Sequence, residues 1–197
     1  MGERSSVARE AARLLYCGMA EEYIQAKEMA ASSLGINVTP SNYEVAVELD
    51  RLADELEGGE RQRRLTEMRT TALEVMTTLR NFNPRLIGSV WRGTARQGSD
   101  IDIVALSDSP ERVEAVLHSY RIREKEEVTF KRGVHAYHFK LDLGHDEVEV
   151  VVRSPAEYIE ERCDIYGDVK RGLSLTELER LLRVDPLRKF VPGRRSR

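Results

Sequence analysis

The sequence predicts an α+β fold, in which a small mixed β-sheet carries helices on one face and follows an all-helical segment. Two observations support this class. Residues 1–82 place apolar side chains at helical spacing, whereas residues 84–154 contain several short apolar runs typical of strands. The 41% hydrophobic and 33% charged residues are typical of a globular protein with a highly charged surface. We therefore expect a sheet of four or five strands with helices packed on it.

The first 82 residues contain three predicted helices, at about 6–32, 42–57 and 60–82. Gly35 is placed to end the first helix, and Gly58-Gly59 separates the second from the third. The third helix has an apolar stripe at helical spacing, formed by Leu65, Met68, Ala72, Leu73, Met76 and Leu79.

The pattern changes at residue 84, where a helix stops before Pro84. Strands are predicted at 85–90, 99–107, 126–130, 134–143 and 147–153. Helices are predicted at 110–120, 155–164 and from Ser174 to about Val184, the last with Ser174 and Glu177 as a capping box.

Three parts of the chain are expected to differ in role. Residues 1–82 form the helical segment, 83–154 the sheet-containing core, and 155–197 the C-terminal helices and tail. The last ten residues, 188–197, carry five basic side chains and read as a solvated tail.

Composition excludes several classes of protein. The net charge of −3 excludes a globally basic nucleic-acid binder but leaves room for a local basic patch. Cys17 and Cys163 have no metal-type neighbours and read as reduced thiols. No apolar run reaches the length of a membrane span, and the first residues lack a signal-peptide core. We expect a cytoplasmic protein without a membrane partner.

The most informative stretch runs from Leu86 to Val104. A Gly88-Ser89 pair follows an apolar run, and Asp100-Ile101-Asp102 comes ten residues later. Residues two apart on a strand face the same way, so Asp100 and Asp102 are expected to point together. Two co-facing carboxylates repel each other unless a cation sits between them. Oxygen ligands of this kind suit Mg²⁺ or Mn²⁺.

The segment Ile87-Gly88-Ser89, with Asp100-Ile101-Asp102-Ile103 after a ten-residue spacer, resembles the signature of the DNA polymerase β-type nucleotidyltransferase superfamily. The signature itself covers about a tenth of the chain, and the resemblance extends over roughly residues 83–154 with the downstream strand. It implies a nucleotidyltransferase-like sheet, a bound nucleoside triphosphate and a divalent cation. Asp100 and Asp102 are then the shared metal ligands and catalytic carboxylates.

A third carboxylate is expected on a neighbouring strand, flanked by apolar residues. Glu149 interrupts the run Val148 to Val152, where a carboxylate is costly unless it is paired or metal-bound. We predict Glu149 as the third catalytic and metal-binding residue. Asp142, between Leu141 and Leu143, is the rival for this role.

Small and basic residues near the motif are candidates for nucleotide binding. Gly88 lets a phosphate approach the backbone, and the Ser89 hydroxyl and N–H can donate to the β- or γ-phosphate. Arg92 and Arg96 are candidates for triphosphate contacts because a guanidinium binds phosphate oxygens well, although either is equally compatible with a surface charge. Ser99 is expected to fix the turn or an acid by hydrogen bonding. These five residues form the predicted nucleotide site.

Trp91 is read as a packed aromatic rather than a base-stacking residue. The four histidines show no metal spacing with cysteine, and none is given a catalytic or metal-binding role.

The resemblance implies an enzyme that transfers a nucleoside monophosphate, with AMP from ATP as the expected case, to a hydroxyl and releases pyrophosphate. The acceptor stays open among an RNA 3′ end, a protein side chain and a small molecule, and the oligomeric state also stays open. The alternative is an antitoxin-like or regulatory nucleotide-binding partner of another protein, in which the N-terminal helices are an interaction surface.

Overall fold

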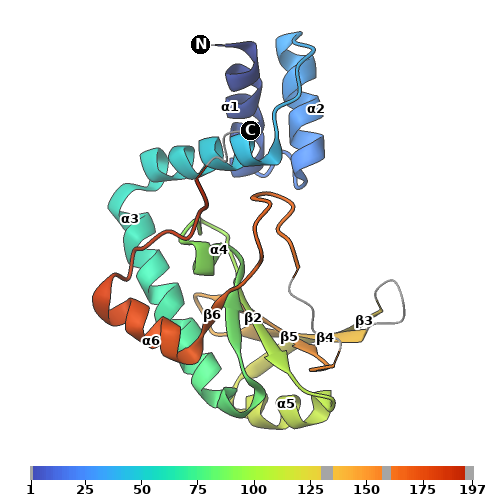
Figure 1. Ribbon diagram of the computed structural model, residues 1–197, viewed down its shortest axis with the longest axis vertical. Helices are drawn as coiled ribbons and strands as arrows, with labels where there is room; N and C mark the ends of the chain where they lie inside the picture. Colours follow the sequence, from blue (N-terminus) through green and yellow to red (C-terminus); the bar gives the residue numbers. More distant parts are fainter. Residues whose placement is uncertain (1, 130–134, 157–160, 194–197) are drawn as a thin grey trace. The chain divides into compact units, whose positions relative to one another are not determined.

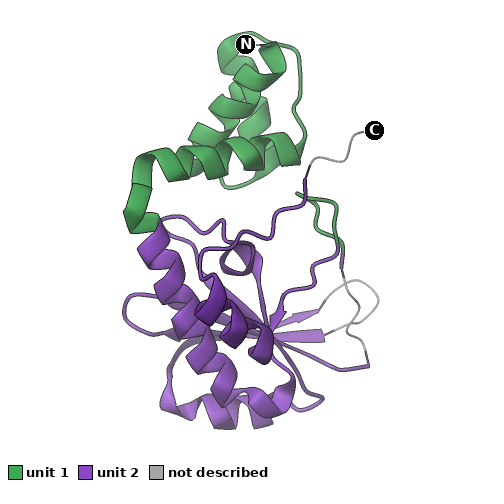
Figure 2. Ribbon diagram, turned by 60° about the vertical axis from the view of Figure 1, so that its left-hand side comes forward, with its two compact units in different colours: residues 1–61, 162–168 green, residues 62–161, 169–197 purple. Residues whose placement is uncertain are grey.

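The computed structural model describes residues 2–129, 135–156 and 161–193. The chain divides into two compact units, coloured separately in Figure 2. Unit 1 consists of Met1–Arg61 and Arg162–Asp168, and unit 2 of Gln62–Glu161 and Val169–Arg197. This division follows contacts within the chain. The predicted division by role, into 1–82, 83–154 and 155–197, stays a prediction.

Unit 1 is helical, with α1 (Glu3–Tyr16), α2 (Tyr23–Leu34) and the first part of α3 (Asn42–Thr78). The prediction of one helix over 6–32 is wrong, because the chain leaves the helical conformation between Tyr16 and Tyr23. Gly18 lies in this break with a φ of +67°, which a helix does not allow. Apolar residues happen to continue at helical spacing across the break, so their pattern hides it.

The long helix α3 contains one non-helical residue, Gly58, with φ +55° and ψ −134°. Few side chains tolerate this conformation, so glycine is the residue that allows it. The predicted separation of two helices at Gly58-Gly59 matches this point. Nearby in unit 1, the buried Arg61 guanidinium pairs with Asp50 at 2.6 Å and also with Asp54.

Unit 2 is built on a six-stranded sheet in the order β3-β4-β5-β2-β1-β6 (Figure 1). Among the strand pairs formed by the described residues, β2–β5 alone is parallel. The strands are β1 (Arg85–Ile87), β2 (Ile101–Leu106), β3 (Arg121–Thr129), β4 (His135–Asp142), β5 (Glu147–Arg153) and β6 (Leu173–Ser174). The predicted mixed sheet is confirmed, with one strand more than expected because the two-residue β6 has no strand pattern of its own.

One face of the sheet is covered by the latter part of α3, by α5 (Pro110–Val116) and by α6 (Leu175–Val184). Two 3₁₀ turns, Arg80–Phe82 and Leu117–Ser119, complete this layer. The predicted stripe of α3 faces the sheet. The main core also takes inward side chains from the central strands, including Ile101, Ile103, Val148, Val150 and Phe139.

Several predicted boundaries need correction. The strand expected at 85–90 ends at Ile87, because Gly88 takes a φ of +71° and opens the short helix α4 (Gly88–Arg92). The helix expected over 155–164 is not seen at 155–156 or 161–164, while 157–160 lie outside the described residues. Residues 130 and 134, predicted as strand ends, also lie outside them.

The C-terminal prediction is partly confirmed. Ser174 and Glu177 form the expected capping box at the start of α6. The start of the tail is not frayed, because the Phe190 N–H donates to the Arg92 carbonyl at 2.8 Å. Residues 194–197 lie outside the described part.

Cys17 and Cys163 are free thiols. Within the described residues, no helix combines the length and the apolar character needed to cross a membrane.

Candidate active site

The strand register places two predicted site residues, Asp102 and Glu149, in one row across the sheet. Asp102 on β2 is paired with Ile87 on the antiparallel β1 and with Glu149 on the parallel β5. Glu149 is paired in turn with Lys140 on β4. Neighbouring strands are about 4.8 Å apart, so the two carboxylates start from adjacent backbone positions.

These carboxylates lie on the face opposite the helix layer. Ile101 and Ile103, which flank Asp102, are fully buried in the main core, and so are Val148 and Val150, which flank Glu149. Because side chains alternate along a strand, Asp102 and Glu149 project from the other face. The predicted alternation of buried apolar residues with carboxylates is therefore present in both strands.

Gly88 lies directly against the Asp102 carboxylate. A Cβ atom built on Gly88 would stand 1.9 Å from Asp102 Oδ2, far inside contact distance. Only glycine fits here, both for this reason and because of the positive φ at position 88. The Gly-Ser pair and the second aspartate of the motif, which are fourteen positions apart in sequence, thus form one local unit.

Asp102 is held in an environment that disfavours its charge. Burial first of all, and then the nearby Glu149 and Asp100 carboxylates, raise the pKa of its carboxyl to about 6. The pKa of Asp100 is raised as well, first by burial and then by Glu147 and Glu149, against the opposite effect of Lys140. The three predicted acids are therefore electrostatic neighbours whose mutual repulsion a cation would relieve.

Glu149 has a partner that sequence reasoning missed. Its Oε1 lies 3.0 Å from Nδ1 of His138 on the adjacent strand β4. The other ring nitrogen of His138, Nε2, is buried without a hydrogen-bond partner. The available signal was the alternation along β4, which puts His138, Lys140 and Asp142 on one face.

Asp142, the rival for the third carboxylate, lies farther away. It is on β4, which is separated from β2 by β5, and it is paired with Glu147 rather than Glu149. Its Oδ1 accepts a hydrogen bond of 3.0 Å from the Gly144 N–H in the following turn. Its other oxygen is 3.9 Å from Arg121 Nη1. These contacts account for Asp142 as a turn residue.

Among the described residues, no group of three or more His, Cys, Asp or Glu side chains is gathered closely enough to hold a metal ion. The Glu149 carboxylate is turned toward His138, as its hydrogen bond indicates. The donor set nevertheless fits a hard divalent cation, because it consists of carboxylate oxygens, and the charge of Glu149 contributes to the raised pKa values of Asp100 and Asp102.

The other small residues of the motif shape the turn between α4 and β2. The Ser99 hydroxyl accepts a hydrogen bond of 3.0 Å from the Arg96 N–H, and the Ser99 N–H donates to the Arg96 carbonyl at 3.0 Å. Ser99 is therefore placed as a turn-forming residue. Arg96 is half-buried and its Nη1 lies 3.4 Å from the Gln97 carbonyl. Ser89, on the first turn of α4, is half-buried.

Arg92 occupies a different environment from the one predicted. Its side chain is 5% exposed, and its Nη1 donates to the Phe190 carbonyl at 2.9 Å. Its guanidinium also lies 4.4 Å from the centre of the Trp91 ring. The Arg92 side chain therefore contributes to packing within unit 2. Trp91 is 5% exposed and belongs to the main core, as expected for a packed aromatic.

Comparison with known protein families gives one match. Residues 78–169 match the family described as "Nucleotidyltransferase domain". This segment contains the Gly-Ser pair, both aspartates and Glu149. No curated protein matches the sequence significantly.

Solved structures similar to this chain include Cid1 in complex with the UTP analogue UMPNPP, with 17% sequence identity and a TM-score of 0.34. Another is a structure of a cytoplasmic RNA terminal U-transferase, with 19% identity and a TM-score of 0.34. Each match covers 45% of this chain and 30% of the other. The chain thus spans less than a third of the length of these relatives.

Proposed function

We propose that the chain transfers a nucleoside monophosphate from a nucleoside triphosphate to a hydroxyl group, on the strength of the match between residues 78–169 and the nucleotidyltransferase domain family. In this reaction the hydroxyl loses its proton and its oxygen bonds to the α-phosphorus. The bond to the β-phosphate breaks, and pyrophosphate leaves. We propose ATP as the nucleotide and the cytoplasm as the location, since both cysteines are free thiols.

The observation that carries the proposal is the pairing of Asp102 with Glu149 beside Gly88. Asp102 and Glu149 are paired on adjacent strands, and burial, Glu149 and Asp100 together raise the pKa of Asp102 to about 6. Such an arrangement is costly for the fold itself, so a functional role is the simplest reason for it.

We propose that Asp100, Asp102 and Glu149 hold Mg²⁺ or Mn²⁺. When bound, such a cation lowers the pKa of the attacking hydroxyl and neutralises charge on the triphosphate. Asp142 is the weaker candidate, because its oxygens already contact the turn at Gly144 and it is one strand farther from Asp102.

Gly88 and Ser89 are proposed to hold the triphosphate. Gly88 leaves the backbone open to a phosphate, and the Ser89 hydroxyl can donate to a phosphate oxygen. Arg96, which is half-buried near the motif, is the remaining basic candidate. The engaged guanidinium of Arg92 makes it a weaker one. We place the catalytic core at 83–154 and assign acceptor choice to the flanking segments 1–82 and 155–197.

Pyrophosphate release tests this function. The wild-type chain is incubated with Mg²⁺, a cell extract as the source of acceptor, and each of the four nucleoside triphosphates in turn. We expect it to release pyrophosphate, and to do so fastest with ATP. Asp100→Asn and Asp102→Asn should lower the rate at least about 100-fold while remaining folded by circular dichroism. Equal rates in these variants and in the wild type would contradict the assignment.

The acceptor follows from the same reaction run with α-labelled ATP. The label should enter one of three fractions, RNA, protein or small molecules, and the labelled fraction identifies the acceptor class. Labelling that persists in the Asp102→Asn variant would come from another protein in the extract and would not count as transfer by this chain.

A further inference from the structure

Arg69, in the part of α3 that belongs to unit 2, is a fully buried cation at 0% exposure. Burial lowers the pKa of its guanidinium to about 10, so the group stays charged at neutral pH. Its donors reach four main-chain carbonyls, those of Val90, Trp91, Pro186 and Arg188. A buried charge needs partners of this kind, and here they come from two segments far apart in sequence.

The first two carbonyls belong to α4, the helix that begins at Gly88. Arg69 Nε donates to the Val90 carbonyl at 3.1 Å, and Nη2 donates to the Trp91 carbonyl at 2.9 Å. A helix of five residues leaves most of its carbonyls without a partner inside the helix. Arg69 supplies partners from outside, and so fixes the helix that carries Ser89.

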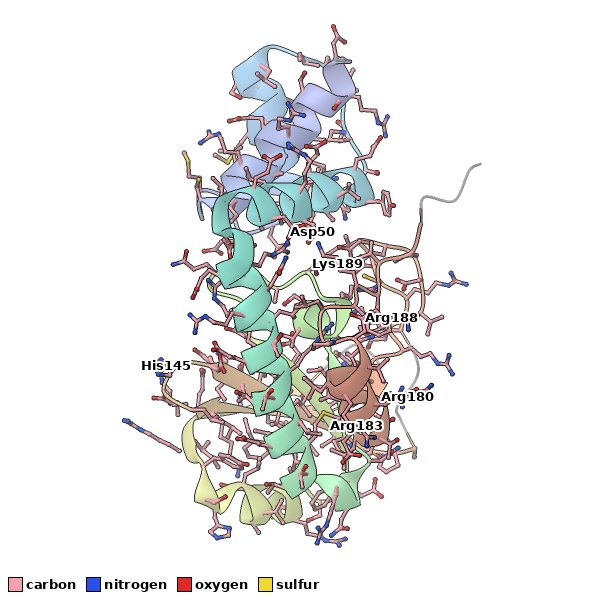
Figure 3. All side chains as sticks on the ribbon, turned by 90° about the vertical axis from the view of Figure 1, so that its left-hand side faces the viewer. Asp50, His145, Arg180, Arg183, Arg188 and Lys189 are labelled. Atoms are coloured by element: carbon pink, nitrogen blue, oxygen red, sulfur yellow. The ribbon has the colours of Figure 1, made fainter. Side chains whose placement is uncertain are left out.

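The other two carbonyls belong to residues 185–190, which follow α6 and which we call the C-terminal strap. Figure 3 shows Arg188 and Lys189 on this segment, beyond Arg180 and Arg183 on α6. Arg69 Nη2 donates to the Arg188 carbonyl at 3.0 Å, and a further guanidinium nitrogen donates to the Pro186 carbonyl.

The strap also contacts the end of α4 directly. The Phe190 N–H donates to the Arg92 carbonyl at 2.8 Å, and Arg92 Nη1 donates to the Phe190 carbonyl at 2.9 Å. A Cβ atom on Gly93 would stand 2.8 Å from the Arg188 carbonyl oxygen and 3.2 Å from Arg69 Nη2. The strap, Arg69 and the end of α4 are therefore packed without spare room.

We propose that Arg69 and the C-terminal strap position the Gly88-Ser89 turn for the triphosphate, so that the C-terminal segment is a working part of the nucleotide site. This inference rests on the proposed function, because it assumes that Gly88 and Ser89 contact the phosphates. Arg69 acts through main-chain atoms of α4, which makes it a positioning residue rather than a catalytic one.

Two substitutions with a matched control test the proposal. Arg69→Lys keeps the charge but replaces the planar fork with one ammonium, which cannot reach four carbonyls together. Phe190→Pro removes the N–H that donates to Arg92, and Phe190→Ala, which also loses the ring, keeps that N–H. The difference between the two Phe190 variants reports the main-chain bond.

The first readout is the affinity for α,β-methylene-ATP, measured with Mg²⁺ by calorimetry. We expect Arg69→Lys to weaken it about tenfold, and Phe190→Pro to weaken it about fivefold more than Phe190→Ala does. The affinity for AMP, which lacks the β- and γ-phosphates, should change less than about twofold. Equal losses for AMP and for the triphosphate analogue would indicate general damage and overturn the proposal.

The second readout is amide hydrogen exchange over residues 88–94. Exchange should be faster in Arg69→Lys and Phe190→Pro than in the wild type, since α4 loses external partners. Unchanged exchange, or unchanged analogue affinity, would overturn the proposal. If the wild type binds the analogue but releases no pyrophosphate from ATP, the proposed function is contradicted. The affinities of the variants would still show whether Arg69 and the C-terminal strap position the triphosphate site.

Discussion

At the scale of single residues, Asp102 links the stability of the fold to its chemistry. Its pKa is raised from an ordinary value of 3.8 to about 6, so the folded protein keeps this proton at a pH where the unfolded chain has lost it. Stability then falls as the pH rises through the window from about 4 to about 6. At pH 7 the carboxyl is mostly ionised and destabilises the fold, unless a cation compensates its charge.

This link predicts the behaviour of Asp102→Asn without metal. In EDTA, we compare the free energy of unfolding of the variant with that of the wild type. The gain in stability of the variant should be about 2 kcal/mol larger at pH 7 than at pH 4. Urea denaturation at both pH values measures the difference. Added Mg²⁺ should stabilise the wild type and not the variant. A difference that is the same at pH 4 and pH 7 would contradict the raised pKa.

Gly88 gives a second prediction at this scale. In Gly88→Ala, the added Cβ would lie 1.9 Å from Asp102 Oδ2 on a residue with a positive φ. The substitution should therefore displace that carboxylate and lower nucleotide turnover at least about 100-fold. Gly98→Ala is the matched control, with a φ of +77° and nothing within 4 Å of its added Cβ. The control should lose only about 1–2 kcal/mol of stability and keep most of its activity. Similar kinetics in the two variants would refute the special role of position 88.

Some of these residues could be predicted from sequence and others could not. The burial of Ile101 and Ile103 on the face opposite Asp102 was predictable, because alternation along a strand is a local property. The roles of Asp100, Asp102 and the Gly88-Ser89 pair stay predictions. Arg69 was not predicted as a buried residue, although it lies between Met68 and Ala72 of the apolar stripe. Its burial depends on hydrogen bonds to carbonyls such as that of Arg188, about 120 positions later in the sequence. The engagement of Arg92 was missed for the same reason, since its partner Phe190 lies in an expected solvated tail.

At the scale of elements, the parallel pairing of β2 and β5 decides which acid faces Asp102. The periodicity of each strand gives its buried face, but register depends on long-range pairing that sequence alone leaves open. The break between α1 and α2 was missed because Gly18 is a weak signal inside a continuing apolar pattern. The Ser174 cap was predictable because a capping box is fixed by residues three apart.

The start of α6 offers a stability prediction independent of catalysis. The Ser174 N–H donates to Glu177 Oε2 at 2.8 Å, and the Ser174 hydroxyl accepts from the Glu177 N–H. Ser174→Ala should therefore cost about 1 kcal/mol in the free energy of unfolding. Thr70→Ala, at an exposed position in α3, should change it by less than about 0.5 kcal/mol. Equal effects in denaturant titrations would argue against the cap.

At the scale of the whole molecule, the net charge of −3 conceals an uneven distribution. Unit 1 has 14 acidic and 7 basic residues, a net charge of −7, whereas unit 2 has 20 acidic and 24 basic residues, a net charge of +4. The proposed site, with its three acids, belongs to the positive unit. A polyanionic triphosphate is therefore attracted to unit 2 as a whole, while the local acids require a cation for it to bind.

The binding of Mn²⁺ in the presence of α,β-methylene-ATP, followed by electron paramagnetic resonance, tests whether Asp102 and Glu149 are metal ligands. We expect the wild type and Asp142→Asn to take up Mn²⁺, and Asp102→Asn and Glu149→Gln to bind it at least about tenfold more weakly. Mn²⁺ binding that is unchanged in Asp102→Asn and Glu149→Gln would show that these carboxylates are not the metal ligands.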